Sequence, residues 1–170
     1  IYNNFLKSQN QFNIYTIPSY SNYENRINNI HKLNTNTILM GHSSGCITAI
    51  NNCPKYIKKI ILLDPVITPT YDSTINLDFL EEIIIINAEL SYKWSIIPPF
   101  FPFIPFFSLT KKNLNIDKNK IKIIEIKNYG HTDILNNPWR DIMHYSRISR
   151  GNYNRSTEIF KNYYYFYSNI

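Results

Sequence analysis

The chain has 170 residues, of which 44% are hydrophobic and 18% charged, and its formal net charge is +6. This composition is typical of one globular domain and excludes a disordered chain. Because the lysines are scattered, the basic balance does not indicate nucleic acid, and no nucleic-acid partner is expected. A basic binder of nucleic acid or anionic lipid stays as an alternative on the net charge alone. Four arginines gather near the C-terminus and form either a phosphate-binding patch or a solvated face: Arg140, Arg147, Arg150 and Arg155.

The two cysteines and the longest apolar stretch indicate in which kind of compartment the protein folds and whether it spans a membrane. Cys46 and Cys53 lie seven residues apart on a predicted helix, too far for a disulfide, and are interpreted as core thiols, consistent with a reducing compartment. No metal or organic cofactor is expected. The sequence has no pattern typical of a signal peptide, and four prolines interrupt its longest apolar stretch, residues 96–107, so no membrane-spanning helix is predicted. The chain begins at Ile1 without an initiator methionine, which leaves room for a leader or upstream strands.

In chain order, residues 1–9 are predicted to end a helix and Phe12–Ile17 to form a strand. A helix then starts near Ser21, which fits a capping box with Glu24. Its apolar stripe is formed by Tyr23, Ile27 and Ile30. A closing helix is predicted over residues 157–167, with Ile159, Tyr163 and Phe166 on one face.

Four apolar runs are predicted as strands: residues 36–40, 58–63, 83–86 and 121–126. Continuous apolar runs imply burial on both faces of a sheet, and helix-length segments separate them. The pattern therefore predicts an α/β fold of three layers, α/β/α, with a mainly parallel sheet covered by helices on each side. Charge interrupts the last run, which places that strand nearer the edge of the sheet.

The segment Gly41-His42-Ser43-Ser44-Gly45 fits the Gly-x-Ser-x-Gly nucleophile elbow, with a predicted strand before it and a predicted helix, residues 46–53, after it. In such an elbow the glycines allow the strand and helix backbones to approach closely. The Ser43 hydroxyl would stand at the carboxyl edge of the sheet as a nucleophile, with the Ser44 backbone N–H as an oxyanion donor. The alternative is a plain strand-to-helix turn capped by Ser43 or Ser44.

A serine hydroxyl needs an imidazole base and a carboxylate that orients it. Asp64 follows the strand after the elbow helix, and His131 follows the last predicted strand. The chain order Ser43, Asp64, His131 is therefore that of an α/β-hydrolase triad. Glu89, one strand later than Asp64, is the alternative acid.

Simpler interpretations stay open for several of these residues. Asp64 before Pro65 is also typical of a turn, and His131 of a surface loop. Asp133 is interpreted as a helix N-cap rather than a partner of His131. The remaining histidines follow no predicted strand end and are interpreted as surface or packing residues: His31, His42 and His144.

Residues 91–110 combine Trp94 and five phenylalanines with prolines, which predicts an irregular apolar excursion rather than a helix or strand. It is interpreted as a wall or lid of an acyl pocket, with Phe100, Phe101 and Phe103 as pocket residues. The same excursion, over residues 96–107, allows contact with a membrane or lipid surface. The sequence does not indicate an oligomeric state.

Three segments together resemble the α/β-hydrolase superfamily: the elbow, Leu63-Asp64-Pro65-Val66, and residues 129–135, Tyr-Gly-His-Thr-Asp-Ile-Leu. Within it they are most similar to chlorophyllase-like esterases and related lipases. The resemblance runs from about Phe12 to the end of the chain and implies Ser43 as nucleophile, Asp64 as acid and His131 as base. The variable excursion of such enzymes implies a fatty or isoprenoid chain in the substrate.

The chain departs from that family in two ways. Cys46 stands where a second glycine is usual, and the early strands and the loop that donates a second oxyanion N–H are absent from this sequence. Either the sequence is a fragment, or the protein is a reduced, inactive hydrolase acting as a binding module. The expected function is hydrolysis of a lipophilic carboxylic ester through an acyl-enzyme, as in a lipase or esterase, with one domain over residues 1–170.

Overall fold

The structure is a computed structural model, and it describes residues 23–89, 91, 108–127 and 130–131. These fall into two compact units. The first comprises Ile17–Asn87 and Ile104–Ile126, whereas Glu89, Lys127 and His131 belong to the second. Several predictions lie outside the described residues: the elements before Tyr23, the Pro- and Phe-rich stretch with its pocket phenylalanines, Asp133, His144, the arginine group and the closing helix.

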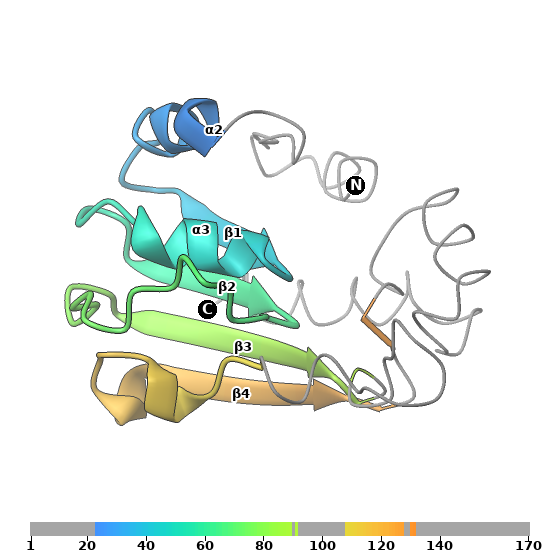
Figure 1. Cartoon of the computed structure of the whole chain (residues 1–170). Helices are drawn as coiled ribbons and strands as arrows, with labels where there is room; N and C mark the ends of the chain where they lie inside the picture. The colour runs from blue at the N-terminus through green and yellow to red at the C-terminus, as the bar shows by residue number, and fades with distance from the viewer. Residues whose placement is uncertain (1–22, 90, 92–107, 128–129, 132–170) are drawn as a thin grey trace, which may run out of the picture. The chain divides into compact units, whose positions relative to one another are not determined.

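Within the described residues, the sheet has four strands in the order β1-β2-β3-β4. They are β1 (Ile38–His42), β2 (Lys59–Leu63), β3 (Glu82–Ala88) and β4 (Ile121–Ile126). β1 pairs with β2 and β2 with β3, both in parallel, and the arrows of β3 and β4 in Figure 1 point the same way. The predicted α/β class with a parallel sheet is confirmed, and among the four described strands β4 is an outer one, as its interrupted apolar run predicts.

Two helices precede and follow β1: α2 (Tyr23–Ile30) and α3 (Gly45–Asn51). Both agree with the predicted helices, and α3 contacts β1 and β2. Two short 3-10 helices, η2 (Lys111–Asn113) and η3 (Lys118–Lys120), come before β4. The strand predicted at residues 36–40 ends two residues too early, because the apolar run stops at Met40 while β1 continues through His42. The interpretation that His42 has no strand-end position is therefore wrong.

The helix-length segment between β2 and β3 does not form a helix, because residues 64–81 form turns. Pro65 and Pro69 disfavour a helix here. The backbone N–H and hydroxyl of Thr74 donate to the Asp72 carboxylate at 2.9 and 2.6 Å. Such side-chain bonds compete with helix formation, so the polar residues of this connection select turns.

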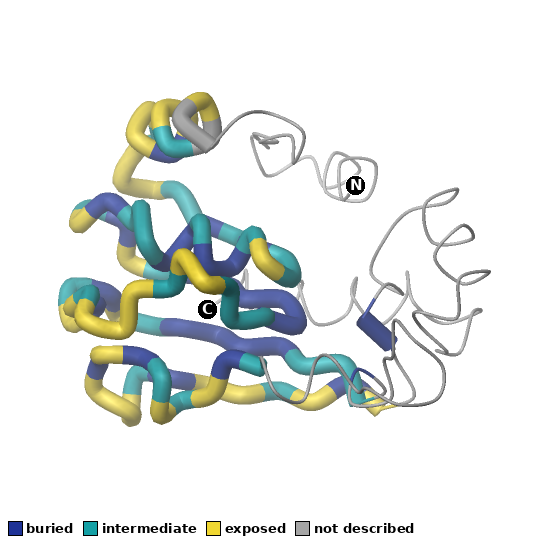
Figure 2. The backbone as a smooth tube through the Cα atoms, viewed as in Figure 1, coloured by how far each residue is buried: buried dark blue, intermediate teal, exposed yellow. Residues whose placement is uncertain are grey.

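The core lies on both faces of β2 and β3, whose central residues are dark blue in Figure 2. Ile60, Leu62, Ile83 and Ile85 belong to one cluster with the buried side chains of α3. The alternate residues along the same strands point to the opposite face and are buried too: Ile61, Leu63, Ile84 and Ile86. Burying each such side chain is worth about 1.5–3 kcal/mol, which explains why uninterrupted isoleucine runs become central strands.

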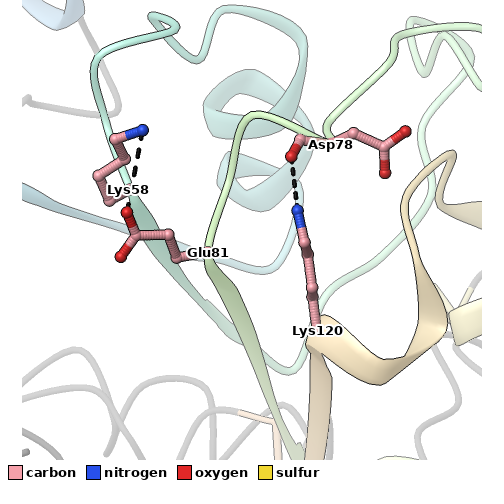
Figure 3. Close-up of polar contacts among 4 residues, drawn as sticks. All are labelled: Lys58, Asp78, Glu81 and Lys120. Carbon is pink, nitrogen blue, oxygen red and sulfur yellow. Dashed lines mark hydrogen bonds and ion pairs between the residues drawn. The ribbon is translucent and has the colours of Figure 1, made fainter.

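The amino ends of the strands are joined by polar contacts that stabilise the fold (Figure 3). Just before β2 and β3, the Lys58 ammonium lies 3.9 Å from the Glu81 carboxylate. Lys120, just before β4, donates through Nζ to the backbone carbonyl of Asp78 at 2.6 Å. The first residues of β2 and β3 form a closer pair, Lys59 with Glu82 at 2.8 Å. The candidate site lies at the opposite, carboxyl edge of the sheet.

Candidate active site at the carboxyl edge of the sheet

The turn between β1 and α3 is a sharp strand-to-helix turn with a strained residue at its centre. Ser43 follows the last residue of β1 and has φ of 55°, in the left-handed region. A residue with a Cβ pays about 1–2 kcal/mol to adopt this conformation, and such strain gathers at functional sites. Ser44 then enters the helical region with φ of −62° and ψ of −23°. The predicted sequence of strand, sharp turn and helix is confirmed.

Gly41 is the residue that lets the helix approach the strand. A Cβ on Gly41 would lie 2.7 Å from the Cys46 Cα, 2.8 Å from the Cys46 nitrogen and 2.9 Å from the Gly45 oxygen. These are backbone atoms, so no side-chain rotation would relieve the contacts. At Gly45, by contrast, a Cβ would have no heavy atom of the described chain within 4 Å. The steric role expected of both glycines therefore holds for Gly41 and is wrong for Gly45.

Backbone hydrogen bonds tie Ser43 to the end of β2. Its N–H donates to the Leu63 carbonyl at 3.0 Å, and its own carbonyl accepts from the N–H groups of Cys46 at 3.1 Å and Val66 at 3.4 Å. Ser43 is thus hydrogen-bonded to Cys46 in the first turn of α3 and to two residues near Asp64, Leu63 and Val66. These three backbone hydrogen bonds stabilise the unfavourable φ of Ser43.

Asp64 lies at the neighbouring strand end, directly after β2. It also has a positive φ, 44°, and its N–H donates to the Ile86 carbonyl of β3 at 2.7 Å. The residue is only 8% exposed. Burial of a charge costs free energy unless it is compensated, so Asp64 is not an ordinary solvated turn residue.

Ser44 presents an available donor at this edge. The residue is exposed, and among the described residues no acceptor takes its backbone N–H. It occupies the N-cap position of α3 without a side-chain cap hydrogen bond, which disfavours the interpretation of Ser44 as a simple cap. A backbone N–H at this position, one residue after Ser43, is free of internal acceptors among the described residues and could donate to a bound anion.

The candidate base and the alternative acid belong to the second compact unit. His131 lies five residues after the end of β4 and is 5% exposed, so it is not a surface loop histidine. Glu89 directly follows β3, and its carboxylate lies 3.5 Å from the Lys127 ammonium. The Glu89 side chain is 36% exposed. The carboxylate of the alternative acid is therefore both ion-paired and partly solvated, whereas Asp64 is buried.

Cys46 has a role that the sequence did not reveal. Its Sγ lies 3.6 Å from the Leu63 carbonyl oxygen, and its side chain is fully buried. Burial, together with the nearby Asp64 charge, raises the pKa of the Cys46 thiol, so it is a neutral S–H donor. Burial raises the pKa of Cys53 to about 12, and both thiols are free, as predicted. A cysteine on an apolar helix face predicts only a core position, and nothing in the sequence indicates this hydrogen bond.

Within the described ranges of residues, no three side chains of His, Cys, Asp or Glu gather in a group that could hold a metal ion. None of the helices in these ranges is long and apolar enough to cross a membrane. Comparisons with protein-family models, curated proteins and solved structures find no match to this chain.

Proposed function

We propose that the protein is a serine hydrolase of the α/β-hydrolase fold that cleaves a lipophilic carboxylic ester through an acyl-enzyme. The observation that carries the proposal is the conformation of Ser43. This serine has φ of 55°, directly follows a parallel strand, and lies two residues after Gly41, where any Cβ would collide with backbone. Together these features give the strained strand-to-helix geometry of a nucleophile elbow.

The arrangement of the strands supports the same fold. Strands β1 to β4 lie side by side in chain order, so residues that follow successive strands reach one edge of the sheet. Ser43 follows β1 and Asp64 follows β2. A three-layer fold related to the chlorophyllase-like esterases accounts for this order and for the motifs around Ser43, Asp64 and His131.

The proposed reaction has two halves. In the first, His131 accepts the proton of the Ser43 hydroxyl while Oγ attacks the ester carbonyl, and the imidazolium then returns the proton to the leaving alcohol oxygen. In the second, a water attacks the acyl-enzyme, again with His131 as base, and Ser43 leaves with the proton. Asp64 orients the imidazole and stabilises its positive charge. The Ser44 N–H donates to the oxyanion in both tetrahedral intermediates.

The substrate class rests on residues 96–107, which lie outside the described residues. Their phenylalanines are proposed to line an acyl pocket, which favours a fatty or isoprenoid ester. Phe101→Ser with Phe103→Ser should reduce turnover of a long-chain p-nitrophenyl ester much more than that of the butyrate. Equal losses for both esters, with a collapse of the melting temperature, would instead make the segment structural core.

The direct test of the activity compares three proteins on p-nitrophenyl butyrate. Wild type should hydrolyse it, and Ser43→Ala should fall by about four to six orders of magnitude, towards the uncatalysed rate. Ser73→Ala, which removes an exposed serine of the connection between β2 and β3, should retain wild-type activity. Folded wild type without hydrolysis above the Ser43→Ala rate would favour the inactive binding module instead.

A further inference from the structure

We propose that Cys46 is a positioning residue of the elbow, whose thiol holds the Leu63 carbonyl and through it both Ser43 and Asp64. The positioning of the Leu63 peptide by Cys46 does not depend on any activity of the protein. Its effect on catalysis rests on the proposed hydrolase function.

The Leu63 carbonyl is the point at which three parts of the site meet. It accepts the Ser43 N–H at 3.0 Å and the Cys46 thiol at 3.6 Å. Leu63 is also the last residue of β2 and directly precedes Asp64. A shift of this one peptide unit would therefore move the nucleophile and the acid together.

Cys46 also contacts Ser43 from the other side. Its backbone N–H donates to the Ser43 carbonyl at 3.1 Å, and its backbone packs against Gly41 on β1. Because the Cys46 backbone occupies the space over β1, its side chain bridges to β2. The thiol thus adds a side-chain hydrogen bond from the first turn of α3 to the end of β2.

The chemistry of the thiol suits this role. Cysteine is small and apolar enough to be fully buried, yet its S–H can donate one weak hydrogen bond. Alanine would lose the donor, and glycine would lose both the donor and the packing. The raised pKa keeps the thiol protonated, so that the Leu63 carbonyl faces a donor rather than a thiolate.

The test uses variants that each remove one buried heavy atom from α3. Cys46→Ala removes the sulfur, whereas Ile47→Val removes a methyl group from the next residue, which makes no side-chain hydrogen bond to Leu63. Cys46→Ser keeps a donor at the same position. The first readout is hydrogen exchange of the Ser43 and Asp64 backbone amides, which does not depend on activity.

In Cys46→Ala, exchange at these two amides should rise about tenfold relative to Ile47→Val, and Cys46→Ser should recover part of the protection. On the p-nitrophenyl ester, Cys46→Ala should lower kcat about three- to tenfold with KM within about twofold, because small misplacements act on the chemical step. Ile47→Val should keep the wild-type kcat.

The outcomes separate the two claims. If exchange in Cys46→Ala equals that in Ile47→Val, the positioning role is refuted, whatever the activity. If exchange rises but wild type hydrolyses no ester, the positioning role stands and the proposed function fails. If Cys46→Ala does not fold, the same comparison is made with Cys46→Ser. Exchange protection of its Ser43 and Asp64 amides should then lie between that of wild type and that of unprotected amides. Full loss of protection there would refute the proposal.

Discussion

Substitution of Gly41 by alanine is the sharpest structural test of the elbow. The added Cβ would lie 2.7 Å from the Cys46 Cα, so the two atoms must separate by about 0.7 Å to reach an ordinary contact near 3.4 Å. Because the opposing atoms are backbone, α3 itself must move away from β1. Overpacking of this kind costs about 1–3 kcal/mol in the free energy of unfolding. For a chain of this size, that lowers Tm by about 2–4 °C per kcal/mol.

Gly45→Ala is the matched control, because it adds the same methyl group four residues later. No described heavy atom lies within 4 Å of that methyl position, and the φ of Gly45 is not positive. Alanine within a helix is favoured over glycine by about 0.5–1 kcal/mol, so this variant should be as stable as wild type or more stable. Urea denaturation of both variants measures the difference. A Gly41→Ala protein as stable as Gly45→Ala would refute the close packing of α3 on β1.

The other predictions concern the acid, an ion pair and a thiol. Asp64→Asn should leave the fold intact, since asparagine tolerates the φ of 44°, yet lower turnover by about three to four orders of magnitude; Glu89→Gln should change it little. The reverse result would move the acid one strand later. The side chains of Lys59 and Glu82 are 23% and 28% exposed, and a double-mutant cycle on this pair should give a coupling energy of about 0.5–1 kcal/mol. The more exposed pair of Lys58 and Glu81 in Figure 3 should give a smaller coupling energy. Equal coupling energies would show that burial does not strengthen the first pair. Because burial raises the pKa of Cys46, the thiol keeps its proton in the folded protein and loses it on unfolding above pH 9.0. Above this pH the free energy of unfolding of wild type should therefore fall with pH by up to about 1.4 kcal/mol per pH unit, whereas Cys46→Ala lacks this contribution. Parallel pH profiles would show that the thiol is not buried.

The sequence predicts the strands of the sheet well because buried strands are marked by runs of apolar residues. Uninterrupted isoleucine and leucine runs have few ways to leave water other than as central strands, and β2, β3 and β4 lie within one or two residues of their predicted bounds. The interrupted run of β4 likewise predicts its edge position, where Ile123 is 44% exposed. The end of β1 is not predicted, because Gly41 and His42 carry no apolar signal and are held by pairing with Leu62 and Leu63.

The site is predictable in its residue types and not in its geometry. Gly41 and Ser43 are found from a motif because only particular residues fit a close approach and a strained turn. The positive φ of Asp64 and the bond from Cys46 to Leu63 depend on where α3 sits over two strands, which no local pattern encodes. The turns of residues 64–81 escape prediction for a related reason, since segment length alone does not distinguish a helix from a series of side-chain-capped turns.

The claim that Ser43 is the nucleophile is tested most directly by reaction with a fluorophosphonate, which forms a covalent adduct only with an activated serine. Peptide mass mapping of the treated wild-type protein should find the adduct on Ser43 alone, and Ser43→Ala should remain unmodified. A folded wild-type protein that carries no adduct, or an adduct on Ser44 or another serine, would contradict the account.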